Sequence, residues 1–357
     1  MQYAKALEQL LQLPPYQLSA PEKQANLREI FLSLHNMHMA HCPAYRKIFQ
    51  NIPIDRIQSL PDFPFLAVRL FKLFELSSIS QDDIFKVVYS SGTSGQAPAK
   101  IYLDRDTSTR QSKTLVKILQ SFLGKQRLPM LIIDTPSVLK ADGTYSARAA
   151  GIQGLSLFAR EKCFVLDDDM QLNKSKLKAF VERYREQPVL LFGFTFMVWQ
   201  YFLQAIDNDD ELNLPQGLLL HSGGWKKLEA EKVSNEDFKR CAFERIGLKA
   251  VHNFYGMAEQ TGTIFVECEQ GYLHTPNMAD VIIRDPESLD ELGESETGII
   301  QVLSVLPTSY PGQSLLTEDL GQIHGEDNCL CGRKGKYFSV HGRLPKTEVR
   351  GCSDTHT

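Results

Sequence analysis

The chain has 357 residues, 43% of them hydrophobic, and a formal net charge of -4. A chain of this length and composition folds into one large or two smaller domains with a sizeable core. The slightly acidic balance predicts no attraction to nucleic acid or to an anionic membrane, and no apolar run reaches membrane-spanning length. Seven irregularly spaced cysteines fit reduced thiols better than a disulfide framework. Because Glu8 stands where a secretion signal needs an apolar core, we expect a cytoplasmic protein.

Residues 1 to about 60 carry a helical pattern, which Pro14 and Pro15 interrupt. Three histidines in this region, His35, His38 and His41, are spaced three apart and therefore lie on one face of a helix. No nearby carboxylate or cysteine completes a metal site, so we favour a packing or surface role for these histidines over metal binding.

A loop rich in glycine and hydroxyl groups, residues 89–100, lies between two apolar runs that predict a β-hairpin. Glycine lets the backbone approach a ligand, and consecutive backbone N–H groups in such a turn form an anion-binding concavity. Lys100 adds a positive charge, so the loop has the composition of a phosphate-binding loop, although it is not a Walker A motif. The alternative is a solvated turn. The candidate phosphate-binding residues are Ser90, Ser91, Gly92, Thr93, Ser94 and Gly95.

Strands alternate with helices along the middle of the chain, which predicts a parallel sheet in an α/β domain. The first of these helices is expected to begin at Asp106 or Thr107. Ligands collect beyond the carboxyl ends of parallel strands. Three such ends carry distinctive residues: an aromatic–glycine loop at 192–196, a bare-backbone turn at 221–225 and a tyrosine–glycine–glutamate segment at 253–259.

These three loops suggest complementary roles, although each alone could be an ordinary strand-to-helix turn. The aromatic–glycine loop could line an apolar pocket, and the glycine turn suits the close approach of a flat ligand. In the third loop, Tyr255 offers a ring face and Glu259 a carboxylate. A carboxylate that faces a triphosphate requires a divalent cation between them, usually Mg²⁺.

Beyond residue 260 the pattern changes to short strands linked by turns, at 261–269, 271–274, 279–283 and 298–305. This pattern predicts an antiparallel β subdomain. Asp319 then lies in a tight strand–loop setting, where its carboxylate could accept hydrogen bonds from ribose hydroxyls. We therefore expect an α/β core at 1–260, a β-rich subdomain at 261–343 and a short tail at 344–357.

A second constellation consists of Cys268, His274, Cys329 and Cys331. A hairpin at 268–274 could bring the first pair beside the second, and three thiolates with one imidazole suit tetrahedral Zn²⁺. The alternative is a set of unrelated buried thiols and a turn histidine, because the Cys-x-Cys spacing is shorter than usual for zinc ligands.

Five motifs occur in a fixed order: Ser-Ser-Gly-Thr-Ser-Gly at 90–95, Ser-Gly-Gly at 222–224, Tyr-Gly-Met-Ala-Glu at 255–259, Thr-Glu-Asp-Leu-Gly at 317–321 and Gly-Arg at 342–343. This order resembles the adenylate-forming superfamily. The segments at 64–72 and 41–45 are most similar to one branch, the bacterial acyl-protein synthetases, which are fatty acid–luciferin-component ligases of luminescence operons. The resemblance covers essentially the whole chain. Phenylacetate-CoA-ligase-like relatives carry Cys/His pairs similar to those described above.

The resemblance implies an α/β adenylate-forming core whose usual C-terminal domain is missing or reduced to a tail. It implies activation of a carboxylic acid, in this branch a fatty acid, with ATP and Mg²⁺. The acyl group would pass to a protein thiol, and then to an acyl reductase or an acyl-carrier protein. Transfer to coenzyme A is an alternative within the same enzyme class. A non-catalytic nucleotide- or acyl-binding subunit is an alternative from another class.

The resemblance also assigns roles to single residues. The hydroxyl loop would hold the ATP phosphates. Lys100, the cation that follows this loop, is a candidate catalytic residue on the composition of the loop alone. Glu259 would bind Mg²⁺, Asp319 the ribose, and Arg343 would mark the hinge that follows the nucleotide domain. The adenine would be framed by Ser222, Gly223, Gly224, Tyr255 and Gly256. The acyl pocket would be lined by Phe192, Gly193 and Phe194.

Cys352 is the candidate acyl acceptor, because luminescence acyl-protein synthetases carry the acyl group on a cysteine close to the C-terminus. Arg350 would favour the thiolate form of this cysteine, and Gly351 permits a local turn. The tail has little apolar content and is expected to move. An inert exposed thiol is the alternative.

Overall fold

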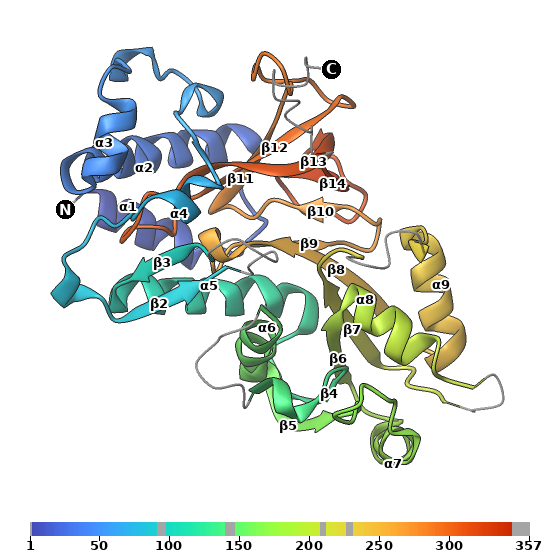
Figure 1. Ribbon diagram of the computed structural model, residues 1–357. Coiled ribbons are helices and arrows are strands. Elements are labelled where there is room, and N and C mark those ends of the chain that lie inside the picture. The colour runs from blue at the N-terminus through green and yellow to red at the C-terminus, as the bar shows by residue number, and fades with distance from the viewer. Residues whose placement is uncertain (1, 91–97, 140–146, 208–211, 226–230, 345–357) are drawn as a thin grey trace, which may run out of the picture.

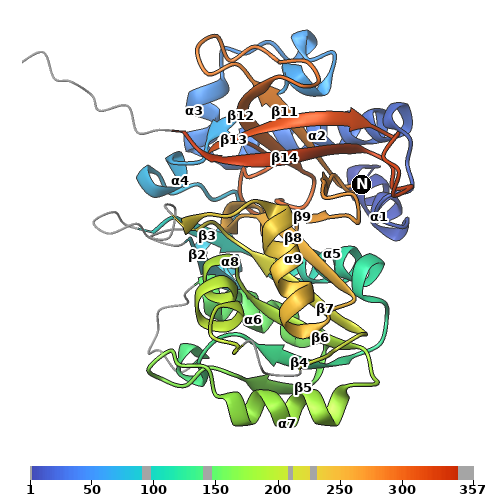
Figure 2. The same cartoon turned by 90° about the vertical axis from the view of Figure 1, so that its right-hand side faces the viewer.

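A single large β-sheet organises the computed structural model, which describes residues 2–90, 98–139, 147–207, 212–225 and 231–344 (Figure 1). In the described part the sheet has 12 strands, and its order is β11-β12-β13-β14-β10-β9-β8-β7-β6-β4-β5, with β1 paired to β13. Figure 2 shows β4 and β5 at one end of the molecule and β11 to β14 at the other. Within the described residues, no helix combines the length and the apolarity that a membrane crossing requires.

Three helices form the N-terminal part: α1 (Gln2–Gln12), α2 (Ala20–His41) and α3 (Pro43–Phe49). The predicted break at the two prolines is confirmed, and a capping box between Ser19 and Glu22 begins α2. The packing or surface role predicted for the three histidines agrees with the structure. His35 contacts the Tyr45 hydroxyl in the core and His38 contacts Ser78, whereas His41 is exposed.

The middle of the chain forms the predicted parallel sheet, in which β5, β4, β6, β7 and β8 are neighbours. Its strands are β4 (Leu128–Ile132), β5 (Ala159–Phe164), β6 (Val189–Phe194), β7 (Gly217–Ser222) and β8 (Ala250–Gly256). Its helices are α5 (Arg105–Leu123), α6 (Ala147–Leu155), α7 (Lys174–Tyr184), α8 (Thr195–Met197), which continues as a π-helical turn, and α9 (Asn235–Ile246). The predicted cap of α5 is wrong by two residues, because the Asp104 carboxylate accepts the hydrogen bond from the Thr107 N–H.

The C-terminal part is antiparallel, as predicted, but it is not a separate sheet. Strand β9 pairs with β8 through Tyr255 and Phe265, so hydrogen bonding continues across residue 260. Strand β13 continues through Asp319, which pairs with Arg343 of β14, but its register with β12 shifts between Leu316 and Leu320. The strand–loop setting predicted for Asp319 is therefore a β-bulge within a strand. The strands are β9 (Ile264–Glu267), β10 (Leu273–His274), β11 (Ala279–Arg284), β12 (Thr297–Ser304), β13 (Ser314–Glu326) and β14 (Lys336–Arg343).

A short segment connects the N-terminal helices to this sheet. Strand β1 (Leu66–Ala67) pairs in parallel with β13, and α4 (Leu70–Leu73) follows directly. The predicted hairpin, β2 (Lys86–Tyr89) and β3 (Lys100–Leu103), comes next and forms a separate two-stranded sheet. This arrangement places α4 near the beginning of β13 (Figure 1).

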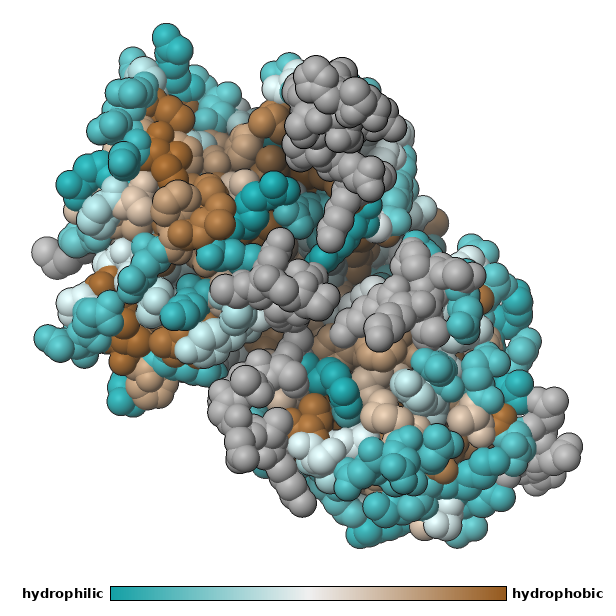
Figure 3. Space-filling model, viewed as in Figure 1, coloured by the Kyte–Doolittle hydropathy of each residue, from teal (hydrophilic) through white to brown (hydrophobic). Residues whose placement is uncertain are grey.

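Hydrophobic side chains also gather on the surface. Figure 3 shows them on the face over α3 and α4. Ile48, Leu73 and Phe74 are 43%, 68% and 51% exposed, respectively. Exposed apolar groups that lie together on a surface are suited to contact with another molecule.

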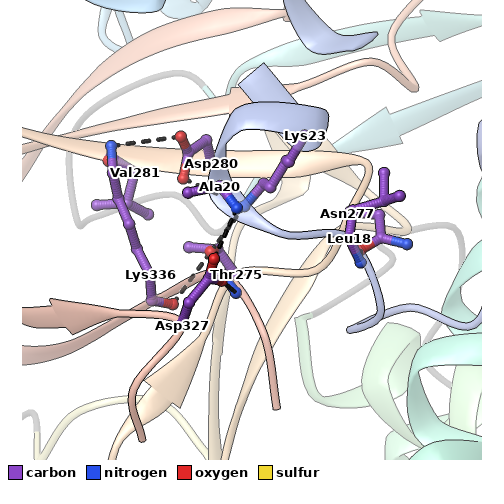
Figure 4. Close-up of polar contacts among 10 residues, drawn as sticks. Leu18, Ala20, Lys23, Thr275, Asn277, Asp280, Val281, Asp327 and Lys336 are labelled. Carbon is purple, nitrogen blue, oxygen red and sulfur yellow. Dashed lines mark hydrogen bonds and ion pairs between the residues drawn. The ribbon is translucent and has the colours of Figure 1, made fainter. Parts of the chain in front are cut away.

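A buried ionic cluster fastens α2 to the C-terminal strands (Figure 4). The Lys23 ammonium donates to the Thr275 hydroxyl at 2.8 Å and lies 3.3 Å from one carboxylate oxygen of Asp280. The Lys336 ammonium lies 3.3 Å from the other oxygen. Lys23 and Asp280 are only 1% and 0% exposed, so Asp280 is the shared counter-ion of two desolvated ammonium groups.

We expect Asp280→Asn to lower the free energy of unfolding by about 3–5 kcal/mol, because two buried ammonium groups would lose their common counter-ion. Urea denaturation followed by tryptophan fluorescence measures this change. Asp207→Asn is the matched control, since its ion pair with Lys174 is solvent-exposed and should contribute less than about 1 kcal/mol. Equal midpoints for the two variants would contradict the importance of the buried cluster.

Candidate active site

The described end of the hydroxyl loop lies beside the carboxylate that was predicted to bind Mg²⁺. Ser90 closes the loop, because its N–H donates to the Ala99 carbonyl and its hydroxyl accepts from the Ala99 N–H at 3.0 Å. The same Ser90 hydroxyl hydrogen-bonds to Glu259 and thereby lowers the pKa of that carboxyl. Residues far apart in the sequence, the first loop serine and Glu259, therefore meet in the fold.

Glu259 lies in a short 3-10 turn, Ala258–Gln260, directly after β8. It is 6% exposed, and burial raises its pKa above the ordinary value, while the nearby Lys72 ammonium and Ser90 lower it in part. The Glu259 carbonyl oxygen lies close to Gly312, so that a Cβ added to this glycine would be only 2.8 Å from it. A buried, largely dehydrated carboxylate of this kind suits a divalent cation, which would repay the cost of desolvating the charge.

Asp319 of β13 and Tyr255 of β8 form a second polar pair through their side chains. The Tyr255 hydroxyl donates to Asp319 Oδ2 at 2.7 Å, and Arg343 Nε lies 3.7 Å from Asp319 Oδ1. Burial raises the pKa of Asp319, and its bonds with Tyr255 and Arg343 offset part of that effect. The structure therefore brings together the three residues that the resemblance assigned to the ribose, the adenine and the hinge.

The glycine turn after β7 lies at the carboxyl edge of the parallel sheet. Ser222 pairs with Phe194 of β6 on one side and with Phe254 of β8 on the other. Gly223 has φ of +86°, and a Cβ there would meet the Phe194 ring at 3.0 Å, so a side chain is excluded for two reasons. Among the described residues, no atom lies within 4 Å of a Cβ placed on Gly224. Both glycines are exposed in the described part of the chain.

The residues predicted for the acyl pocket separate into two groups. Phe192 is 1% exposed and packs in the core, and a Cβ on Gly193 would lie 2.9 Å from Ile133 Cβ, so both positions are determined by packing. Phe194 is half-buried beside the Gly223 turn. Of the three, Phe194 is the one whose side chain borders the candidate site.

Lys72 is the neighbour of this site to which sequence reasoning gave no role. Arg69 of the same segment pairs with Glu318 at 2.9 Å, next to Asp319, and the ammonium of Lys72 acts electrostatically on Glu259. The segment at 64–72 was noted only as a resemblance. Its approach to Glu259 depends on the pairing of β1 with β13, which local sequence patterns do not encode.

Several predicted residues do not join this group. Lys100 pairs with Tyr89 in the hairpin, and its side chain is exposed. Ser91, Gly92, Thr93, Ser94, Gly95 and Cys352 lie outside the described residues. A cavity of about 300 Å³ lies near Glu326 and Lys336, at the end of β14 opposite to Arg343, and is not part of the site. The Cys/His constellation also lies toward that opposite end, since His274 pairs with Tyr337.

Comparison with known proteins gives a consistent picture. The family model described as acyl-protein synthetase, LuxE, matches residues 4–357. The long-chain-fatty-acid–luciferin-component ligase of Vibrio harveyi is 20% identical over 95% of this chain and 89% of its own length. The corresponding ligase of Aliivibrio fischeri is 23% identical over 75% of this chain and 71% of its own.

Among solved structures, an open conformation of a 2-hydroxyisobutyryl-CoA ligase, in complex with its adenylate and CoA, superposes with a TM-score of 0.71. The alignment has 18% identity and covers 94% of this chain and 78% of that ligase. At this identity the similarity shows the fold, which is that of adenylate-forming ligases and agrees with the fold class predicted from the sequence. By the match of its family model over nearly the whole sequence, the chain belongs to the LuxE acyl-protein synthetase family.

Proposed function

We propose that the protein uses ATP to activate a carboxylic acid, in this family a fatty acid, and then transfers the acyl group to its own Cys352. The observation that carries the first step is the buried Glu259 carboxylate beside Ser90, together with the hydrogen-bonded Tyr255–Asp319 pair of β8 and β13. The thioester would pass to a partner, either an acyl reductase or an acyl-carrier protein. Leu73 and Phe74, exposed beside Lys72, offer that partner an apolar contact.

The chemistry has two steps. A carboxylate oxygen of the acid attacks the α-phosphorus of ATP, a P–O bond forms, and pyrophosphate leaves with the electrons of the broken P–O bond. The Cys352 thiolate then attacks the carbonyl carbon of the acyl adenylate, a C–S bond forms, the acyl C–O bond to the phosphate breaks, and AMP leaves with the electrons of that bond. The protein contributes by positioning the reactants and by neutralising charge on the phosphates.

Each residue of the site has a role in this proposal. Glu259 would hold Mg²⁺, which supplies positive charge to the phosphates. Ser90 and the loop that follows it would bind the phosphate oxygens, Asp319 the ribose hydroxyls, and Tyr255 with the Ser222–Gly224 backbone would frame the adenine. Lys72 supplies a protein cation on the phosphate side. Phe194 would border the acyl chain.

Carboxylate-dependent exchange of labelled pyrophosphate into ATP tests the first step. With Mg²⁺ present, we expect exchange with long-chain fatty acids and little with short or aromatic acids. Absence of exchange over the whole panel would favour a non-catalytic nucleotide- or acyl-binding subunit. Exchange accompanied by soluble acyl-CoA, without acylated protein, would favour the coenzyme A ligase.

The charge of Lys72 should influence how pyrophosphate exchange and Mg²⁺ affinity decline at acidic pH. Glu259 must be ionised to bind Mg²⁺, and its pKa is already raised by burial, so apparent Mg²⁺ affinity should fall as the pH drops through that raised pKa. Lys72→Met removes a charge that lowers the pKa, and should therefore move the limb to higher pH and reduce exchange by about 10-fold near neutral pH. The KM for Mg²⁺ measured from pH 5 to 8 reports the shift.

Two variants serve as controls for this experiment. Lys72→Arg retains the charge and should leave the limb close to that of the wild type. Lys113→Met removes an exposed lysine from α5 and should change nothing. If Lys72→Met and Lys113→Met have the same profile, Lys72 does not act on Glu259.

A further inference from the structure

Four side chains from two separate segments of the chain lie together near the beginning of β14, at the end of that strand opposite to Arg343. Cys268 follows β9, His274 belongs to β10, and Cys329 and Cys331 lie in the turn between β13 and β14. One potential ligand atom from each, three sulfurs and an imidazole nitrogen, can be chosen so that all lie within 4.8 Å of one another. Three of the four residues are buried, and Cys331 is half-buried.

We propose that this cluster binds one structural zinc ion. In a tetrahedral Zn²⁺ site with usual bond lengths, two sulfurs lie about 3.8 Å apart, and a sulfur and a nitrogen about 3.6 Å apart. Here the Sγ atoms of Cys268 and Cys329 are 3.9 Å apart, and Cys331 Sγ is 3.3 Å from His274 Nε2. Side chains from separate turns thus already have nearly the spacing that one zinc ion requires.

Backbone hydrogen bonds to sulfur favour the thiolate form of Cys268 and Cys331. The Gln270 N–H donates to Cys268 Sγ at 3.3 Å, and the Arg333 N–H donates to Cys331 Sγ at 3.5 Å. Each donor comes two residues after the cysteine that it serves, so both turns are folded around their sulfur. Hydrogen bonds to the ligands of a metal orient those ligands and stabilise their charge.

Aromatic rings surround the cluster. Tyr337 stacks on the His274 ring at 5.7 Å between centroids, and Tyr16 approaches it edge-on at 6.2 Å. The Arg333 guanidinium lies 4.2 Å from the centroid of the Phe122 ring and pairs with Glu269. Since the protein supplies four ligands and the site is largely closed to water, the proposed zinc has a structural role rather than a catalytic one.

The turn that holds two of the cysteines also holds the segment between α1 and α2. The Lys334 N–H donates to the Tyr16 carbonyl at 3.2 Å, and Asp327 Oδ2 accepts from the Ala20 N–H at 2.7 Å. Figure 4 shows Asp327, Ala20 and Lys23 at this junction. Zinc would therefore fix the turn, and the turn would fix the N-terminal helices to the sheet.

Metal analysis of the full chain, purified without a metal-affinity column, tests the site independently of any activity. We expect one zinc per chain in the wild type, at most a small residue in Cys331→Ser, and an unchanged content in Cys241→Ser, whose thiol lies on α9 outside the cluster. Mass spectrometry of the alkylated protein distinguishes free thiols from a disulfide. Protein without metal, a Cys268–Cys329 disulfide, or stoichiometric iron would each overturn the proposal.

Hydrogen exchange tests the role assigned to the metal. After zinc is removed from the wild type with a mercurial reagent and a chelator, amides of residues 14–23 should exchange at least about 10-fold faster, because local opening there becomes easier. Peptides from α7 should be unaffected, and added zinc should restore protection after the reagent is reversed by thiol. Unchanged exchange at 14–23 after verified metal loss would refute the structural role.

Discussion

Replacing Glu259 with glutamine should reduce carboxylate-dependent pyrophosphate exchange by about 100-fold or more, while the protein remains folded. Glutamine has nearly the same shape but no charge, so it keeps the packing under Gly312 and loses the attraction for a divalent cation. Removing a single preorganised electrostatic group from an active site typically costs about 100- to 1000-fold in rate. Initial rates of exchange at saturating fatty acid measure the effect.

The loss can lie in the KM for Mg²⁺ or in the exchange rate at saturating Mg²⁺, and measuring both shows whether Glu259 acts through the metal ion. If Glu259 holds Mg²⁺, the KM for Mg²⁺ should rise strongly and high Mg²⁺ should restore part of the activity. Glu182→Gln, an exposed carboxylate on α7, is the matched control and should have wild-type rates. Circular dichroism and the midpoint of thermal unfolding confirm that both variants are folded. Wild-type exchange in Glu259→Gln would rule out the assigned role.

Replacing Cys352 with serine should abolish covalent acylation and leave pyrophosphate exchange intact, because the thiol takes part only after the adenylate has formed. Cys352 lies outside the described residues, and the proposal rests on its position in the family and on the neighbouring Arg350. The described chain ends beside the residue that precedes Asp319, because the Leu344 N–H donates to the Glu318 carbonyl at 2.9 Å. Cys352 comes eight positions after Leu344, and a chain of that length spans at most about 28 Å.

The experiment uses the protein with ATP, Mg²⁺ and a labelled fatty acid. Wild type should retain label that hydroxylamine releases, Cys352→Ser should retain none, and Cys163→Ser should behave like the wild type. Label that persists in Cys352→Ser would place the acceptor at another residue. Release of the label as acyl-CoA when coenzyme A is added, with no labelled wild-type protein beforehand, would identify coenzyme A as the acceptor.

The order of the five motifs and the alternation of strands and helices were sufficient to predict the α/β fold and the family. These signals are local: glycine and hydroxyl groups define a loop, and hydrophobic periodicity defines a strand or a helix. Helix α9 (Asn235–Ile246) is delimited by such local features, since Ser234 caps it and Gly247 ends it in a left-handed conformation. Such local signals do not predict which strands pair when the strands lie far apart in the chain.

Tertiary structure decided which of the predicted residues meet. The parallel pairing of β1 with β13 brings Lys72 toward Glu259, although neither strand carries a local sign of the other. Pairing with Arg343 of β14 keeps Asp319 within β13, although the register with β12 shifts there, whereas the sequence predicted a strand–loop setting. The physical reason is that long-range contacts depend on the register and order of strands, which emerge only when the whole hydrophobic surface is buried together. Motif order thus determined the family and the candidate residues, and sheet topology determined their neighbours.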